Sequence, residues 1–211
     1  MVSTIFYCEK DFLIKQDLSM NNKFFINLSR FGFIAVLLYE IFRWRFFRGQ
    51  VVFTWEGLIL TVGLVWIAME VIFYYLDKNK INFSPVSFLM AFISLSLDAF
   101  GDMYGLYDSF SPWFDKIAHL TGGGVIAFII YDILRNVRIR NQNSFSEKWL
   151  FIMTVAIAFL VGFGYEWVEY IEDMLYWGHQ IRLGDAHDTI DDMQLNLLGS
   201  ILAVSILKKY K

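Results

Sequence analysis

Residues 51–75 read VVFTWEGLILTVGLVWIAMEVIFYY, a continuous apolar run whose charged side chains are Glu56 and Glu70. A helix that crosses the hydrocarbon core of a bilayer needs about 20 mostly apolar residues. Residues 149–171 form a second run of this length and character. Both runs are continuous rather than alternating, which argues against a transmembrane β-barrel and favours transmembrane helices.

Four further stretches fit the same pattern, with more polar positions in them. They are residues 24–42, 84–103, 115–134 and 189–208. The first of these contains Arg30, the second ends in acidic residues and the last begins with them. We therefore predict an all-α fold, a polytopic integral membrane helical bundle of about six transmembrane helices. It would form a single transmembrane domain over residues 1–211, with residues 1–23 as a tail.

The composition agrees with a membrane protein and excludes several other classes. Of the 211 residues 57% are hydrophobic, whereas a soluble domain is typically about 45–50% apolar. The single Cys8 rules out an internal disulfide framework and a cysteine metal site. The net charge of −3 gives no electrostatic support for a nucleic-acid partner. The expected partner is membrane lipid.

The distribution of Lys and Arg predicts the orientation, because cytoplasmic loops carry an excess of these residues. With six spans both termini share one side, and that side carries twelve Lys and Arg residues. The other side carries five, which are Arg43, Arg45, Arg48, Lys116 and Arg182. We therefore expect the protein in the cytoplasmic (inner or plasma) membrane, N-in and C-in, with residues 1–23 as a cytoplasmic tail.

This topology places acidic residues from four spans at one outer level. They are Asp98 and Asp102 at the end of the third span, Asp115 and His119 at the start of the fourth, Glu166, Glu169 and Asp173 at the end of the fifth, and Asp188, Asp192 and Asn196 at the start of the sixth. Spacings of three and four put the residues of each span on one helix face. A carboxylate that faces lipid costs several kcal/mol, so these faces should line the bundle interior or a watery cavity.

So many like charges need shared protons, basic partners or a bound cation. Nearby bases are few, with Lys116 and Arg182 the closest in sequence. Paired carboxylates with a histidine on facing helices form the metal sites of helical bundles, and such a donor set suits Mg, Mn, Zn or Fe. We therefore expect a divalent metal ion. The expected ligands are Asp98, Asp102, Asp115, His119, Glu166, Asp188 and Asp192.

Three functions are compatible with such a pocket. The first is a metal-dependent enzyme, a hydrolase or transferase acting on a lipid-linked or cell-envelope substrate. Its catalytic residues would be Asp115, His119, Glu166 and Glu169, and its substrate-binding residues Lys116, Arg182 and Asn196. The second is a cation- or proton-coupled transporter or channel, because membrane carboxylates and histidines also form proton relays. The third is a non-enzymatic envelope scaffold with a structural metal.

Several residues also have a simpler interpretation. The glycines at 122–124 suit either a close approach of two helices or a ligand lying against bare backbone. Asp188 suits the N-cap of the sixth span as well as a ligand role. Glu40 is expected to pair with Arg43 or Arg45. Solvated loop or rim positions are expected for Asp108, Glu172, Asp185 and Asp191.

Three blocks of sequence carry a family resemblance. They are LDAFGDMYGLYDSFSPWFDKIAHLTGGG at 97–124, GYEWVEY at 164–170 and DTIDDMQLNLLGS at 188–200. They resemble the uncharacterised bacterial and archaeal inner-membrane proteins of the YjdF type. The pattern D-K-x-x-H, a membrane glutamate and D-x-x-x-D-x-x-x-N-x-x-G is similar to that of the VanZ-like superfamily, which is linked to glycopeptide (teicoplanin) resistance.

The resemblance covers residues 85–211, the motif-bearing core, and implies a polytopic membrane protein without supplying a reaction. The VanZ-like pattern maps onto Asp115, His119, Glu166, Asp188, Asp192 and Asn196. Members of that superfamily also tend to have an arginine shortly before the aspartate pair, and Arg182 is the candidate for it here.

The orientation is open to a direct test. A reporter that is active only in the cytoplasm, fused after Lys211, should give a signal, because the side with twelve basic residues is expected to stay inside. A periplasmic reporter at the same position should stay silent. The opposite pair of signals would overturn the predicted orientation and place the acidic level on the cytoplasmic side.

Overall fold

The computed structural model describes residues 23–47, 54–111, 113–141, 146–180 and 183–209 of the 211-residue chain. Within these ranges the regular structure is helical, and six helices are long and apolar enough to cross a membrane. The predicted all-α bundle with six spans is thus confirmed. The expected tail, apart from Lys23, lies outside the described residues, as do Arg48 and Arg182.

The helices follow the order of the predicted spans. The long ones are Lys23–Phe46, α2 (Trp55–Lys78), α3 (Pro85–Met103), α5 (Trp113–Arg140), α6 (Glu147–Tyr176) and α7 (Ala186–Lys209). The first helix ends in a π-helical turn, η1 (Arg43–Phe47), and the short α4 (Leu106–Ser109) lies between α3 and α5. Helices α5 and α6 extend beyond the predicted apolar runs, because the prediction stopped where polar residues begin whereas the helices continue through them.

Local sequence determines where these helices begin. The Thr54 hydroxyl accepts a hydrogen bond from the Gly57 amide at 2.9 Å and caps α2. Ser84 caps α3 by accepting from the Val86 amide, and Pro85 stands at the first helical position. Both arrangements satisfy or remove amide donors that the first turn of a helix leaves without partners.

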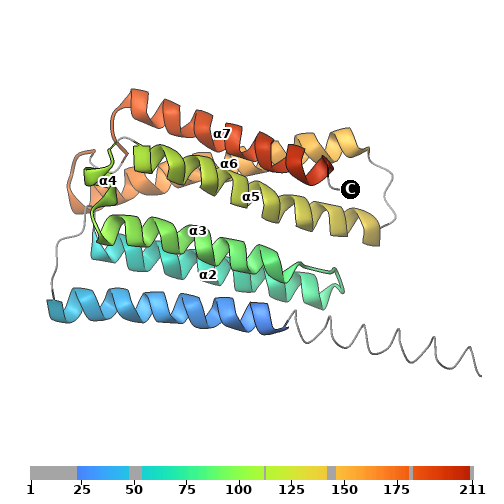
Figure 1. The fold of residues 1–211 in the computed structure, drawn as a ribbon, viewed down its shortest axis with the longest axis horizontal. Helices are drawn as coiled ribbons and strands as arrows, with labels where there is room; N and C mark the ends of the chain where they lie inside the picture. Colours follow the sequence, from blue (N-terminus) through green and yellow to red (C-terminus); the bar gives the residue numbers. More distant parts are fainter. Residues whose placement is uncertain (1–22, 48–53, 112, 142–145, 181–182, 210–211) are drawn as a thin grey trace, which may run out of the picture.

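The spans run up and down, so that helix ends far apart in sequence meet at two ends of the bundle (Figure 1). One end holds α4, the starts of α5 and α7 and the ends of α3 and α6. The other end holds the start of the first helix (blue), the turn between α2 and α3, and the end of α7. Helices α5, α6 and α7 pack against one another, α3 packs against α5, and α2 against α3.

The first helix is attached to α2 and α3 by aromatic side chains. The ring of Phe33, 1% exposed, stacks on Trp66 of α2 at 6.3 Å between centroids and contacts Phe88 and Phe92 of α3 edge-on. Arg30 adds a polar contact, since its Nε and its terminal nitrogen lie 2.6 and 2.7 Å from the two carboxylate oxygens of Glu70. This two-pronged geometry is the strong form of an Arg–carboxylate pair.

A second polar contact joins α5 to the start of α3. Asp132 accepts hydrogen bonds from the Ser84 amide at 2.8 Å, the Ser87 hydroxyl at 3.1 Å and the Asn136 side chain at 2.9 Å. No sequence pattern points to this role, because Ser84 and Ser87 lie more than 40 positions from Asp132 in the chain. Here the carboxylate joins two helices, the structural role that polar groups often have between membrane helices.

Glycines bring α5 and α7 into backbone contact. A Cβ atom added at Gly123 would lie 2.4 Å from the backbone oxygen of Asn196, and one added at Gly199 would lie 2.0 Å from that of Leu120. Gly124 also faces Gly199, whereas a Cβ atom at Gly122 would meet open space. Close approach is therefore the role of Gly123 and Gly124, as small residues allow in membrane helices.

A pair of adjacent substitutions tests this contact. Gly123→Ala should lower the free energy of unfolding by about 1–3 kcal/mol, because the added methyl group meets backbone that cannot move aside easily. Gly122→Ala is the matched control and should cost nothing, since its methyl group points into open space. Thermal unfolding of both variants in detergent checks the difference. Equal melting temperatures would contradict the close contact.

Candidate metal centre

His119 lies in the second turn of α5, a helix that packs against α6 and α7. The start of α5 lies at the same end of the bundle as α4 (Figure 1). The side chain of His119 is 8% exposed, and carboxylates from all three helices surround it. Since a buried imidazole needs polar partners for both ring nitrogens, the groups on each side of the ring decide what the site can hold.

On the Nε2 side of the ring lie two aspartates. Asp115 Oδ1, one helical turn before His119 on α5, is 3.5 Å from Nε2. Asp192 Oδ2 of α7 is 3.8 Å from the same nitrogen. Ligand atoms of these three residues all lie within 4.8 Å of one another, close enough for one ion to reach them together.

On the Nδ1 side lie α6 and an amide from α7. Glu166 Oε1 is 3.7 Å from Nδ1, and His119, Glu166 and Glu169 form a second group whose ligand atoms lie within 4.8 Å. Both glutamates are buried, at 3% and 6% exposure. The Asn196 amide nitrogen is nearer still, 3.2 Å from Nδ1.

Asn196 is held in place by the glycines around it. It is 4% exposed, its backbone contacts Gly123 of α5, and a Cβ atom at Gly162 of α6 would lie 3.0 Å from its side-chain carbon. When its amide nitrogen donates to Nδ1, the ring proton lies on Nε2. If the Asn196 amide is rotated by 180°, His119 Nδ1–H donates to the Asn196 Oδ1 atom. The lone pair of His119 Nε2 is then free to bind a metal.

The remaining expected ligands are not in these two groups. Asp98 and Asp102 are on α3, where Asp98 accepts a hydrogen bond from the Tyr107 hydroxyl of α4 and Asp102 is 2% exposed. Asp188 lies one turn before Asp192 on α7, half-buried. The structure thus brings Asp115, His119, Glu166, Glu169 and Asp192 together, with Asn196 beside them.

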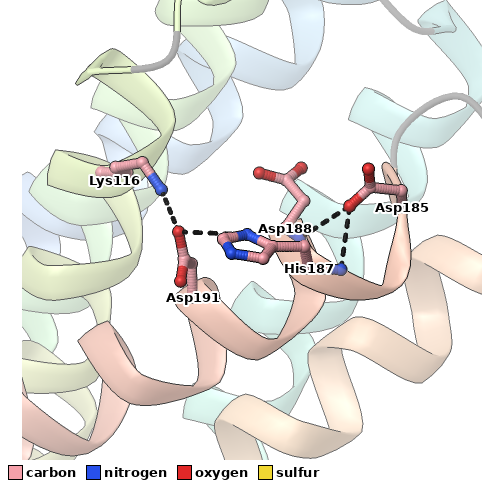
Figure 2. A pocket seen from close by; sticks show the side chains of 5 residues that line it. All are labelled: Lys116, Asp185, His187, Asp188 and Asp191. Atoms are coloured by element: carbon pink, nitrogen blue, oxygen red, sulfur yellow. Dashed lines mark hydrogen bonds and ion pairs between the residues drawn. The ribbon is translucent and has the colours of Figure 1, made fainter.

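Lys116 and Asp188 line an open depression of about 470 Å³ together with Asp185, His187 and Asp191 (Figure 2). Lys116 Nζ is 2.8 Å from Asp191 Oδ2, and His187 Nδ1 is 3.8 Å from the same oxygen. Asp191 therefore carries a contact between α5 and α7, which is more than the solvated rim charge expected from the sequence.

The start of α7 corrects one expectation. The helix begins at Ala186, and Asp185 accepts hydrogen bonds from the His187 amide at 2.8 Å and the Asp188 amide at 3.0 Å. Asp185 is thus the N-cap, and the alternative of Asp188 as the cap is wrong because the helix starts one turn before Thr189. The two amide donors hold the pKa of Asp185 below its usual value.

Two further acids of α6 are buried, although Glu172 was expected to be a rim charge. Glu172 is 5% exposed, and a Cβ atom at Gly57 would lie 2.9 Å from its Oε2. Its carboxylate therefore rests against the first turn of α2, where a helix carries partial positive charge. Asp173, 1% exposed, accepts a hydrogen bond from the Leu183 amide at 3.0 Å.

Glu40 of the first helix also differs from the expectation. Its side chain is 0% exposed, and among the described residues neither carboxylate oxygen has a hydrogen-bond partner. The expected pairing with Arg43 or Arg45 is therefore wrong. The reason is orientation, since Glu40 points into the bundle whereas Arg45 is exposed at the helix end.

Six apolar spans and a cluster of acids around one buried histidine define a polytopic helical membrane protein with a group of residues that could hold a metal ion. The chain belongs to the DUF2238 family of predicted membrane proteins, whose model matches residues 28–211. The match includes five of the six spans in full and the first from residue 28 onward. No curated protein and no solved structure matches the chain.

The contact between Asp173 and Leu183 leads to a local prediction. Asp173→Ala should speed hydrogen exchange of the Leu183 amide at least about tenfold, because that amide loses its acceptor and opens to solvent. Asp108→Ala, at an exposed position of α4, is the control and should leave the rate unchanged. Exchange measured by mass spectrometry checks both. Equal rates in the two variants would mean that the carboxylate does not anchor this segment.

Proposed function

We propose that this protein is a metal-dependent membrane enzyme whose ion binds to Asp115, His119 and Asp192. The observation that carries the proposal is the position of His119 Nε2, 3.5 Å from one aspartate and 3.8 Å from another on a facing helix. Two carboxylates and an imidazole form a donor set that suits Zn, Fe or Mn, and Mg to a lesser degree.

The second group, with Glu166 and Glu169, is the weaker candidate for the ion. Asn196 already lies 3.2 Å from Nδ1, the ring nitrogen that is 3.7 Å from Glu166 Oε1. A metal-bound histidine usually donates its other N–H to a nearby acceptor, which fixes the ring orientation. Asn196 suits that supporting role better than direct substrate binding, so we assign it to positioning His119.

The bound ion would polarise a phosphoryl or carbonyl oxygen or lower the pKa of a water molecule. Glu166 and Glu169 lie beside the same imidazole and would accept the proton from that water. Both are on α6 one turn apart, so either can act while the other keeps the site polar. A buried site of this kind also excludes bulk water, which strengthens each electrostatic contact.

We propose that substrate reaches the site through the depression at the start of α7 (Figure 2). Lys116 would meet an anionic group there, as would Arg182, which lies outside the described residues. Because Lys116 is paired with Asp191, an anionic group must displace that carboxylate. A lipid-linked or cell-envelope substrate fits a pocket at the end of a membrane bundle.

An enzyme explains the arrangement better than a transporter does. The carboxylates around His119 come from the starts of α5 and α7 and the second half of α6. The starts of α5 and α7 and the end of α6 lie at one end of the bundle (Figure 1). Charged groups nearer the other end, Glu70 and Asp132, are engaged in hydrogen bonds that join helices. A relay across the membrane would need exchangeable groups along its length.

The proposal also covers the side of the membrane on which the pocket lies and the relationship of the family to other proteins. We place the pocket on the extracytoplasmic side of the cytoplasmic membrane, on the basis of the Lys and Arg distribution. We also propose that the family is of the YjdF type and related to the VanZ-like superfamily. The spacing of Asp115 to His119 and of Asp188 to Asp192 and Asn196 supports this relationship.

Metal content tests the proposal directly. Purified protein should carry about one equivalent of a transition metal or magnesium, and Asp115→Asn and Asp192→Asn should lose it. Asn196→Ala should weaken metal binding by about 10–100-fold, since it removes a group that orients the ligand. Glu169→Gln should keep the ion, and Asp108→Asn is the exposed control. Elemental analysis and competition with a chelator measure these effects.

Metal-free wild-type protein would refute the proposed centre. If the ion is present, conversion of extracted membrane lipids, followed by mass spectrometry, tests the enzyme. Turnover should disappear in Asp192→Asn and in the double variant Glu166→Gln, Glu169→Gln, although only the first loses the ion. Retained metal with no turnover would favour a scaffold, and metal-dependent ion flux in proteoliposomes would favour a transporter.

A further inference from the structure

The end of the bundle opposite α4 carries a cluster of basic side chains. The ends of α5 and α7 and the start of α6 lie there (Figure 1), and Leu134, Leu150 and Leu207 of these segments belong to one apolar cluster. From Arg135 to the end of α5, in the first turn of α6 and in the last turn of α7, there are six basic residues and one acidic residue, Glu147. We call the six the basic surface, and they are Arg135, Arg138, Arg140, Lys148, Lys208 and Lys209.

The other three long helices carry less charge at the same end. Their described residues there include Lys23, Lys78 and Lys80, together with the acidic Asp77. An excess of basic residues that only sets the orientation can be spread over every loop on that side of the membrane. Its concentration at α5, α6 and α7 therefore indicates an additional role.

Helix dipoles account for only part of this charge. Cations stabilise the last turn of a helix, which suits the basic residues in the last turns of α5 and α7. Arg135, however, lies more than a turn before the end of α5, and Lys148 is in the first turn of α6, where a cation is unfavourable. Both side chains are exposed, and neither forms an ion pair or hydrogen bond within the part of the chain that the structure describes.

The acidic residue of this region already has a basic partner. Glu147 accepts a hydrogen bond from Arg138, and this ion pair joins the end of α5 to the start of α6. Arg140, Lys208 and Lys209 are exposed and, like Arg135 and Lys148, have no carboxylate partner among the described residues. The charge of the basic surface is therefore available to an anionic group from outside the protein.

The basic surface lies at the level expected for phospholipid headgroups. Arg135 is five residues before Arg140, which places it about 7 Å deeper along the axis of α5. Ile139 of α5 and Trp149, beside Lys148, are 59% and 58% exposed. Exposed indole and apolar side chains among cations are typical of the boundary between lipid and water. Long basic side chains at this depth can extend along the helix to a phosphate group.

We propose that the basic surface binds the phosphate headgroups of anionic phospholipids. Basic clusters beside membrane helices attract anionic lipids, and basic pockets between helices bind their headgroups. A lipid suits the position better than a soluble anion, because Arg135 belongs to the apolar helix Trp113–Arg140 rather than to a loop. The basic surface is at the far end of the bundle from His119 and does not depend on the proposed enzyme activity.

Lipid binding by the full-length protein tests this surface. Wild-type protein in detergent, offered equal amounts of phosphatidylglycerol and phosphatidylcholine, should bind the anionic lipid preferentially by native mass spectrometry. Added salt should weaken the preference, because the contact is between charges. The triple variant Arg135→Gln, Lys148→Gln, Lys208→Gln should bind phosphatidylglycerol about 10–100-fold more weakly. The matched control removes the same charge at the same end and should keep the wild-type affinity; it is Lys23→Gln, Lys78→Gln, Lys80→Gln.

Three results would overturn the proposal. Equal binding of the two lipids by the wild type would refute it without any variant. Equal loss in both triple variants would show that the net charge of this end, rather than these three helices, attracts the lipid. A rise in melting temperature with inorganic phosphate as large as that with phosphatidylglycerol would show that the surface takes a free anion instead. All six substituted side chains are exposed, so both variants should melt with the wild type in phosphatidylcholine.

Discussion

The structure depends on one constraint, which is that a carboxylate within a membrane bundle must have compensation from inside the protein. Seven acidic side chains of the described helices are buried, namely Glu40, Asp102, Glu166, Glu169, Glu172, Asp173 and Asp192. Several acids at the α4 end of the bundle are compensated locally. Glu172 lies at the first turn of α2, Asp173 binds a loop amide, and Asp191 pairs with Lys116. The carboxylates of Asp115, Glu166 and Asp192 lie instead beside the imidazole of His119.

The same constraint explains why most of the fold could be predicted from the sequence. Lipid demands long apolar runs, and such runs are visible without any knowledge of tertiary contacts, so all six spans were found. Helical periodicity then placed Asp115 beside His119 and Glu166 beside Glu169. The alternating direction of successive spans predicted that the ends of α3 and α6 lie on the same side as the starts of α5 and α7. These inferences need only spacing and length.

Spacing and length could not predict which side chains on different helices contact one another. Nothing in the spacing of Asp132 points to Ser84, and nothing near Glu40 in the sequence shows that its side chain is buried rather than paired with Arg43 or Arg45. The N-cap at Asp185 was missed for a smaller reason, since the polar first turn of α7 does not resemble a membrane helix.

Helix packing and site chemistry meet at Asn196. Its amide reaches His119 Nδ1 because α5 and α7 approach to backbone contact at Gly123 and Gly199. Gly162 of α6 leaves room for the same side chain from the other direction. A larger residue at any of these glycines would move the amide, and so the ring it orients, before it touched a carboxylate. Glycines that carry no chemistry therefore determine which nitrogen of His119 faces Asp115 and Asp192, and the geometry of the proposed centre is a property of the helix interface as a whole.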